Sequence, residues 1–195
     1  MSCPHPGTAA CGCAGAIDAP RRRVIGIAAA GLVAPLATVT PPAWAAARGD
    51  RLAEEDGEGP PVPLRLADIK PGKPLLAFPI DPKTGKPRDE TRLNKLVLVR
   101  LPEAEMTPAT RERAAGGVLA YSAICTHQGC DVKTWLAKDK ALVCFCHASK
   151  FALLDGAAVL AGPATRALPA MPLALEGEQL VIAGDFTAPP GGAAA

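Results

Sequence analysis

Short apolar runs separated by turn-forming residues make up most of the chain after residue 63. Runs of this length with Gly and Pro between them are typical of strands rather than helices. In the run 95–100, four successive apolar residues predict a strand buried on both faces. The predicted strands span 63–66, 75–80, 95–100, 118–124, 141–145, 151–153, 159–160, 173–175 and 179–182.

The residues between these runs predict turns and a single short helical segment. A turn cluster spans 81–87, and Asp155-Gly156 and the segment 176–178 each predict a hairpin. Thr107 followed by Pro108 predicts one capped helical turn, since proline suits the first helical position. The 21 prolines are scattered, which disfavours long helices. The pattern therefore predicts an all-β fold.

The N-terminal part has a different pattern. Arg21-Arg22-Arg23 precedes an uncharged stretch that runs to residue 47, and Ala43-Trp44-Ala45 forms a small-x-small cleavage pattern. Paired arginines in this context predict a twin-arginine export signal. The stretch is long enough to span a membrane, but prolines at 35, 41 and 42 would break its distal half. Cleavage after residue 45 and retention as an N-terminal membrane anchor both remain open.

Four segments follow from these patterns. Residues 1–45 are the signal segment or anchor, 46–62 a linker, 63–186 the folded domain and 187–195 a disordered tail. Export predicts a periplasmic location, either soluble or anchored to the inner membrane. In that compartment a disulfide can persist.

Charge disfavours nucleic acid as a partner. Three of the 21 basic and one of the 19 acidic residues precede residue 46, so the remainder carries 18 of each. A nucleic-acid-binding domain would show a basic excess. Tyr121 is the only tyrosine, so few aromatic rings could stack on bases.

Two short boxes hold all the cysteines and histidines beyond the N-terminal part. The first runs from Cys125 to Cys130 and the second from Cys144 to Ser149, and together they contain four Cys and two His. A cluster of mixed ligation needs two thiolates on one iron and two imidazoles on the other. Cys125 with His127, and Cys144 with His147, supply that set. The intervening residues are enough for a connecting hairpin.

The boxes resemble those of the Rieske iron-sulfur proteins, whose pattern is C-T-H-x-G-C followed by C-P-C-H-G-S. The resemblance implies an antiparallel β sandwich with a small cluster-binding subdomain of two loops, and a Rieske-type [2Fe-2S] cluster as cofactor. It assigns Cys125 and Cys144 to the inner iron and His127 and His147 to the outer one. The surplus pair, Cys130 and Cys146, would form a disulfide between the loops. Phe145 and Ala148 depart from the pattern, since they replace its proline and glycine.

The resemblance also indicates residues that tune the cluster. In the family the hydroxyl at the position of Ser149 donates to a cluster sulfide. Phe151 stands where quinol-oxidising members carry a tyrosine, and the loss of that donor predicts a lower potential. Gly162-Pro163 resembles the proline loop that covers the cluster.

Other interpretations of the boxes are weaker. Zinc also favours Cys and His, but a zinc site would leave Cys130 and Cys146 without a role. A catalytic cysteine would need a separate base and an orienting group, and neither box offers them. A Rieske oxygenase needs two further histidines, and the chain has only His5 besides those in the boxes. The chain is thus expected to be an electron-transfer subunit without a substrate-binding site of its own.

The host complex is less determined. Over residues 120–183 the chain looks closest to the small Rieske subunit of arsenite oxidase. That resemblance implies a larger molybdopterin subunit as electron donor and a periplasmic cytochrome c or cupredoxin as acceptor. The alternative is a Rieske subunit of a quinol-cytochrome c reductase, with cytochrome b as the larger partner.

Overall fold

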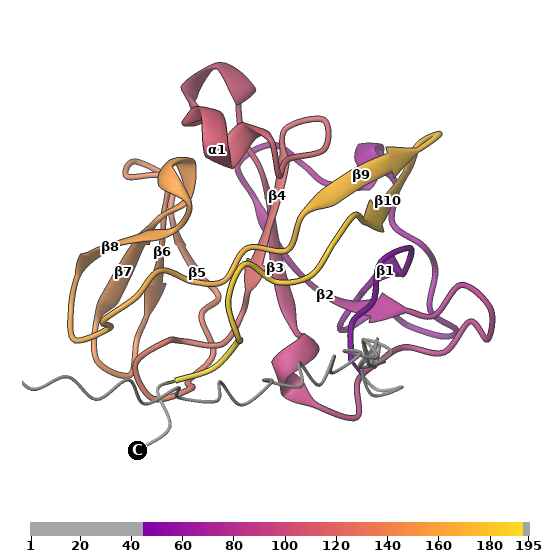
Figure 1. The fold of residues 1–195 in the computed structure, drawn as a ribbon, viewed down its shortest axis with the longest axis horizontal. Coiled ribbons are helices and arrows are strands. Elements are labelled where there is room, and N and C mark those ends of the chain that lie inside the picture. The colour runs from indigo at the N-terminus through magenta and orange to yellow at the C-terminus, as the bar shows by residue number, and fades with distance from the viewer. Residues whose placement is uncertain (1–44, 193–195) are drawn as a thin grey trace, which may run out of the picture. The chain divides into compact units, whose positions relative to one another are not determined.

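Two antiparallel sheets contain the strands of the computed structural model, which describes residues 45–192 (Figure 1). The larger sheet has the order β4-β3-β2-β1-β10-β9 and the smaller one β5-β6-β7-β8. The larger sheet consists of β1 (Arg51–Glu54), β2 (Pro74–Ile80), β3 (Leu96–Arg100), β4 (Val118–Ser122), β9 (Leu173–Glu176) and β10 (Gln179–Ile182). The smaller sheet consists of β5 (Thr134–Leu136), β6 (Ala141–Cys144), β7 (Ser149–Ala152) and β8 (Ala158–Ala161). The predicted all-β fold is confirmed.

Helical structure within the described residues is short. The helix α1 (Pro108–Arg111) begins with proline at its first position, as predicted, and Thr107 is its N-cap residue. The Thr107 hydroxyl bonds the Thr110 hydroxyl rather than a backbone amide. Single 3-10 turns span Leu66–Asp68, Arg92–Asn94, Glu103–Glu105 and Leu153–Asp155.

The strand β3 is buried on both faces, as predicted. Val97 and Val99 point into a cluster that also contains Leu142 and Phe151 of the smaller sheet. Leu96 and Leu98 join a second cluster with residues of β1, β9 and β10. The first cluster therefore joins the two sheets, while the second stabilises the larger sheet on its other face.

The N-terminal boundary of the folded domain is corrected by the structure. Residues 51–54, inside the segment predicted as a linker, form β1, which pairs with β2 on one side and β10 on the other. The predicted strand at 63–66 is wrong, because Leu66 opens a 3-10 turn and only Arg65 makes a bridge, to Gln179. Leu52 in β1 is fully buried. Few residues next to Leu52 in the sequence are apolar, so the pattern of apolar positions alone did not reveal the strand.

The hairpins of the second half follow the predicted pattern. The strands β7 and β8 flank a turn in which Gly156 has a φ of +58°. The strands β9 and β10 close on Gly177, with a φ of +62°. Between the boxes, β5 and β6 form the connecting hairpin expected from the spacing.

The ends of the described chain bear on two other predictions. The export signal lies outside the described residues, apart from its last residue, and among residues 45–192 no helix is long and apolar enough to cross a membrane. Residues 187–192, predicted as part of a disordered tail, instead make specific contacts with the rest of the domain. Thr187 exchanges two hydrogen bonds with Ala170.

Candidate metal centre

The first box is a tight loop that follows β4. The Cys125 amide donates to the Cys130 carbonyl at 2.7 Å, and the Gly129 amide donates to the Cys125 carbonyl at 2.9 Å. Gly129 has a φ of +74°, which L side chains disfavour. These bonds fold the box back on itself, so Cys125 and His127 lie within one short turn.

The second box is the turn of a hairpin. The strand β6 ends at Cys144, β7 begins at Ser149, and these two residues are paired across the sheet. The turn between them contains Ala148, whose φ of +58° lies in the left-handed region where the family pattern has glycine. The backbone shape of this loop is therefore kept although the glycine is replaced.

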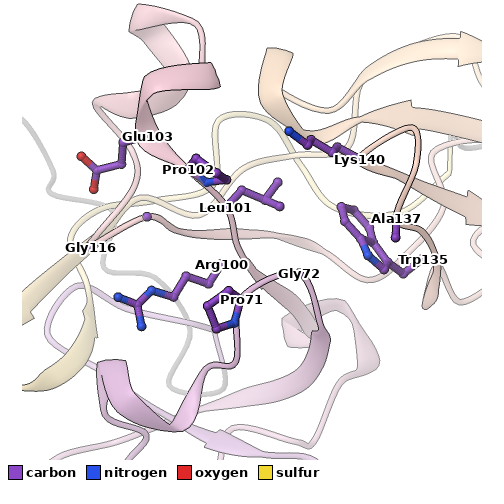
Figure 2. Close-up of a pocket in the computed structure, with 11 residues that line it drawn as sticks. Pro71, Gly72, Arg100, Leu101, Pro102, Glu103, Gly116, Trp135, Ala137 and Lys140 are labelled. Atoms are coloured by element: carbon purple, nitrogen blue, oxygen red, sulfur yellow. The ribbon is translucent and has the colours of Figure 1, made fainter.

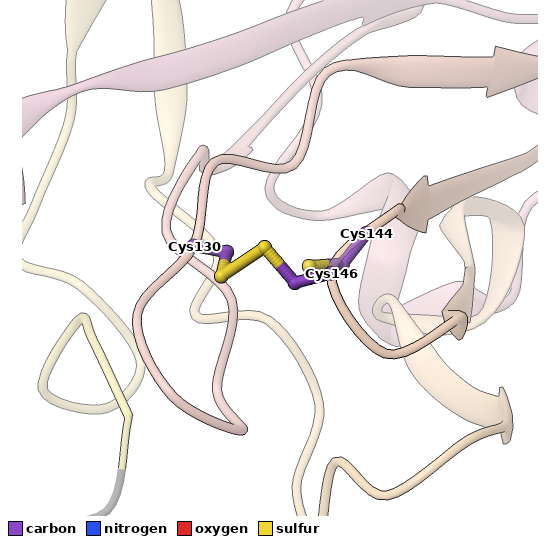
Figure 3. A group of neighbouring side chains, drawn as sticks. All are labelled: Cys130, Cys144 and Cys146. Atoms are coloured by element: carbon purple, nitrogen blue, oxygen red, sulfur yellow. A yellow bond between two sulfur atoms is a disulfide. The ribbon is translucent and has the colours of Figure 1, made fainter.

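A disulfide between Cys130 and Cys146 joins the two loops (Figure 3). The structure thus makes the same pairing as the resemblance implied. The Cys144 sulfur lies within 4.8 Å of both sulfurs of this bond. Because a disulfide sulfur is no longer a thiolate, Cys130 and Cys146 cannot act as soft metal ligands in this state.

Two free thiols lie beneath the loops. Cys125 and Cys144 are each 1% exposed and unoxidised. Burial raises the pKa of the Cys125 thiol, and so does its hydrogen bond with Cys144. Two thiols buried this close together form a pair that a metal cluster would stabilise as thiolates.

Two imidazoles complete the set. The rings of His127 and His147 are edge to face, with centroids 4.7 Å apart. His147 is exposed, whereas His127 is half-buried and its Nδ1 is buried with no hydrogen-bond partner among the described residues. A buried imidazole nitrogen without a partner is costly unless it serves as a ligand. Two thiols and two imidazoles on facing loops fit the donor set of a [2Fe-2S] centre of mixed ligation.

The predicted tuning residues surround the second box. Ser149 is fully buried, and its Oγ accepts a hydrogen bond from the Ala164 amide at 3.1 Å. That bond leaves the Ser149 hydroxyl proton available as a donor. Phe151 is fully buried in the apolar core, among the side chains that also include Cys125 and Cys144.

The segment at Gly162 and Pro163 lies against the second box. A Cβ on Gly162 would come within 2.5 Å of the Ser149 Cα and 2.8 Å of the Ala148 carbonyl oxygen. Only glycine fits this close approach, and its φ of +88° independently favours glycine. The geometry agrees with a loop packed directly on the cluster-binding turn.

Thr126, inside the first box, and Arg166 have roles that the sequence did not indicate. The Thr126 hydroxyl, almost fully buried, donates to the Arg166 carbonyl at 2.7 Å. Thr126 lies between two predicted ligands, so this bond connects the first box to the segment after Pro163. Its position inside the box was the only sequence signal.

A separate pocket of about 790 Å³ lies beside β3 and the β5–β6 hairpin (Figure 2). Arg100 and Leu101 line one side, and Trp135 and Lys140 the other. No box residue lines it. The pocket is therefore distinct from the candidate metal centre.

Comparisons with known proteins agree with the donor set. Residues 81–172 match the model of the Rieske [2Fe-2S] domain. A respiratory nitrate reductase Rieske subunit of Haloferax mediterranei is 39% identical over 141 residues, which cover 70% of this chain and 60% of that protein. The cytochrome bc1 complex Rieske iron-sulfur subunit of Streptomyces lividans is 35% identical over 133 residues, which cover 66% of this chain and 78% of that one.

Among solved structures, the soluble domain of Rieske protein II from Sulfolobus acidocaldarius matches with a TM-score of 0.40 at 24% identity. The match covers 50% of this chain and 64% of that one. The sequence matches imply a Rieske-type [2Fe-2S] cluster as the cofactor.

Proposed function

This chain belongs to the Rieske [2Fe-2S] family and is an iron-sulfur electron-transfer subunit, and we propose that it works in an exported complex, passing electrons from a larger redox subunit to a periplasmic cytochrome c or cupredoxin. Cys125 and Cys144 would hold one iron and His127 and His147 the other. The bound cluster supplies one-electron exchange.

The observation that carries this proposal is the arrangement of the four donors. Two imidazoles lie 4.7 Å apart on loops whose thiols are 1% exposed, and one of the imidazoles, His147, reaches the surface. Because the two thiols are buried, water does not reach that end of the site. The exposed imidazole provides an edge through which a partner can exchange electrons.

The surface around His147 supports docking through apolar contact. Phe145 is 79% exposed, Ala148 in the same turn is exposed, and so is Pro163, which follows the Gly162 that packs against that turn. None of these residues is charged. We therefore expect the partner to present an apolar surface here, with an association rate that depends little on salt.

The Phe145 side chain offers a direct test of that docking surface. In Phe145→Ser the second-order rate of electron transfer to the native partner should fall several-fold, while the absorbance spectrum of the cluster stays the same. Val62→Ser is a matched control, because Val62 is another exposed apolar side chain, at 72%, outside the boxes. An unchanged rate in Phe145→Ser would reject this surface as the contact.

Two observations favour a molybdopterin enzyme, similar to arsenite oxidase, as the larger subunit. Phe151 has no hydroxyl to donate to a ligand sulfur, unlike the tyrosine of quinol-oxidising members. One relative is itself named as a Rieske subunit of a respiratory nitrate reductase.

The second candidate is a quinol-cytochrome c reductase, because other relatives are cytochrome bc1 Rieske subunits. The matched region is 60% of the nitrate reductase relative and 38% of a Streptomyces coelicolor bc1 relative. Purification of the native complex distinguishes the candidates. A molybdenum protein that co-purifies supports the first, and a cytochrome b supports the second.

We further propose export by the twin-arginine pathway. Arg21-Arg22-Arg23 before an uncharged stretch supports it, and the Cys130–Cys146 disulfide fits an oxidising compartment. Replacing Arg21, Arg22 and Arg23 with lysine should leave the protein in the cytoplasm on cell fractionation. Normal export of that variant would reject the pathway.

Electron paramagnetic resonance of the reduced full-length protein tests the cofactor assignment itself. A Rieske signal with two irons per chain is expected. Stoichiometric zinc with a colourless protein would overturn the electron-transfer function.

A further inference from the structure

The C-terminal segment Thr187–Gly192 lies against the first box. A Cβ on Gly192 would come within 2.8 Å of the His127 carbonyl oxygen and 3.1 Å of the Gln128 Cα. Gly192 has no left-handed φ, so the close approach, not the backbone conformation, requires glycine here. In Figure 1 the yellow end of the described chain runs from β10 to the loops that follow β4.

The segment is fixed at its start and near its end. The Thr187 amide donates to the Ala170 carbonyl at 2.9 Å, and the Ala170 amide donates to the Thr187 Oγ1 at 2.9 Å. Gly191 is buried, and a Cβ on it would contact the Leu93 side chain at 3.4 Å. Two anchoring points four residues apart, at Thr187 and Gly191, hold the backbone between them in place.

Arg166 links this segment to the ligands. Its guanidinium donates to the Gly191 carbonyl at 2.6 Å, and its own carbonyl accepts the Thr126 hydroxyl bond at 2.7 Å. Thr126 stands between Cys125 and His127. One residue therefore connects the C-terminal segment with the backbone that positions two of the four ligands.

The two imidazoles differ in exposure, and the less exposed one is on the box that the C-terminal segment contacts. His147, on the second box, is exposed, whereas His127, whose backbone the C-terminal segment contacts, is half-buried. The second box is contacted instead by Gly162, at the Ser149 Cα and the Ala148 carbonyl oxygen, and His147 remains exposed there.

We propose that Thr187–Gly192 is a strap that covers the His127 side of the cluster site, holds the first box in place through Arg166, and so confines electron exchange to the His147 side. The restriction of electron exchange to one side rests on the proposed electron-transfer function. The packing of the strap on the first box rests on the contacts alone. The electron exchange meant here is the passage of one electron from the reduced cluster to an external one-electron oxidant.

Two shortened chains test the strap. A stop after Phe186 removes it, while a stop after Gly192 removes only residues 193–195 and serves as the matched control. Hydrogen exchange at the amides of residues 125–130 reports packing without reference to the cluster. We expect several-fold faster exchange without the strap and no change in the control.

Oxidation of the reduced full-length protein and of both shortened chains by hexacyanoferrate(III) reports access. Loss of the strap should raise the second-order rate several-fold, because a second imidazole edge becomes accessible. A role limited to stability would lower the melting temperature without changing this rate. An unchanged rate would therefore overturn the confinement of electron exchange.

Gly192→Val gives a test without truncation. Its side chain cannot fit against His127, so it should reproduce both effects of the stop after Phe186. Gly184→Ala is the control, since a Cβ there meets only Pro172, at 3.8 Å. Unchanged hydrogen exchange in Gly192→Val and in the shortened chain would overturn the strap. A colourless full-length protein would overturn the proposed function, and hydrogen exchange would still decide the packing.

Discussion

At the scale of single residues, the second box shows how a departure from the family pattern is accommodated. Ala148 adopts the left-handed conformation with φ +58° that the glycine of the pattern adopts freely. For an L residue this conformation costs about 1–2 kcal/mol. The disulfide at Cys146 and the pairing of Cys144 with Ser149 hold the turn in this shape despite that cost.

Ala148→Gly should therefore stabilise the protein. Relief of the left-handed alanine outweighs the greater freedom of glycine in the unfolded chain, so the free energy of unfolding should rise by about 0.5–1 kcal/mol. Urea denaturation followed by circular dichroism measures the change. Ala152→Gly, at a residue with an extended φ of −82°, is the control and should be destabilising. A loss of stability in Ala148→Gly would contradict the interpretation of strain.

At the scale of elements, the two loops depend on links to the strands and to each other. The disulfide closes a loop with a sequence separation of 16 residues. Lys95, beside the start of β3, binds Asp131 at 3.2 Å, and Arg92 also pairs with Asp131. Asp131 directly follows Cys130. These contacts fix the far end of the first box to the larger sheet.

Cys130→Ser should weaken cluster retention without changing the ligand set. Loss of a bridge of this length removes about 3 kcal/mol of stabilisation in the chain-entropy model. The iron should be lost faster to a chelator, while the reduced protein keeps a Rieske resonance spectrum. Cys146→Ser should behave in the same way, because it breaks the same bond. Failure of both variants to bind any iron would indicate that these cysteines are ligands.

Asp131 should contribute to the acid sensitivity of the fold. Burial alone would raise its pKa, but hydrogen bonds from Arg92 and Lys95 outweigh burial and lower it. The unfolded chain then binds the proton more readily, so this contribution is present above the ordinary carboxyl pKa of about 3.9 and is lost as pH falls below it.

Comparison of urea denaturation at pH 6 and pH 3 tests this contribution. Asp131→Asn should show a smaller difference in unfolding free energy between the two pH values than the unmodified protein. The carboxyl carbon of Asp131, followed by NMR, should give a pKa below the usual range. In Lys95→Met that pKa should lie closer to the usual range. A titration at or above the ordinary value would contradict the proposed pairing.

At the scale of the whole molecule, the two sheets are joined through one apolar cluster and a buried hydroxyl. Tyr121 of β4 is 1% exposed, and its hydroxyl donates to the Leu153 carbonyl, next to β7, at 2.7 Å. Burial raises the pKa of this hydroxyl, so it stays protonated and can donate throughout the physiological range. The bond helps to hold the cluster-binding sheet on the larger sheet.

Tyr121→Phe should destabilise the whole domain by about 1–2 kcal/mol, because the Leu153 carbonyl is left buried without its partner. The hydroxyl bonds a carbonyl that belongs to neither box, so the resonance spectrum should not change. Thermal unfolding and electron paramagnetic resonance of the same sample measure the two effects. An altered spectrum with unchanged stability would show that Tyr121 acts on the cluster rather than on the packing of the sheets.

The sequence of this Rieske protein by itself determined the local features. Alternating and continuous apolar runs predicted strands such as β3, because burial on both faces demands apolar residues at every position. The boxes predicted a mixed Cys and His donor set, because few chemistries need those residues at that spacing. Ala148 and Phe145 could be recognised as departures only through the resemblance to the family pattern.

Tertiary structure alone decided the features that depend on residues distant in sequence. β1 is a strand because β2 and β10 lie on either side of its backbone, which four residues of mixed polarity could not indicate. Gly192 contacts His127 across 65 positions of sequence, and Arg166 bonds their neighbours Gly191 and Thr126. Such contacts are made by backbone atoms and single hydrogen bonds. These leave no periodic pattern in the chain, so they become visible only once it is folded.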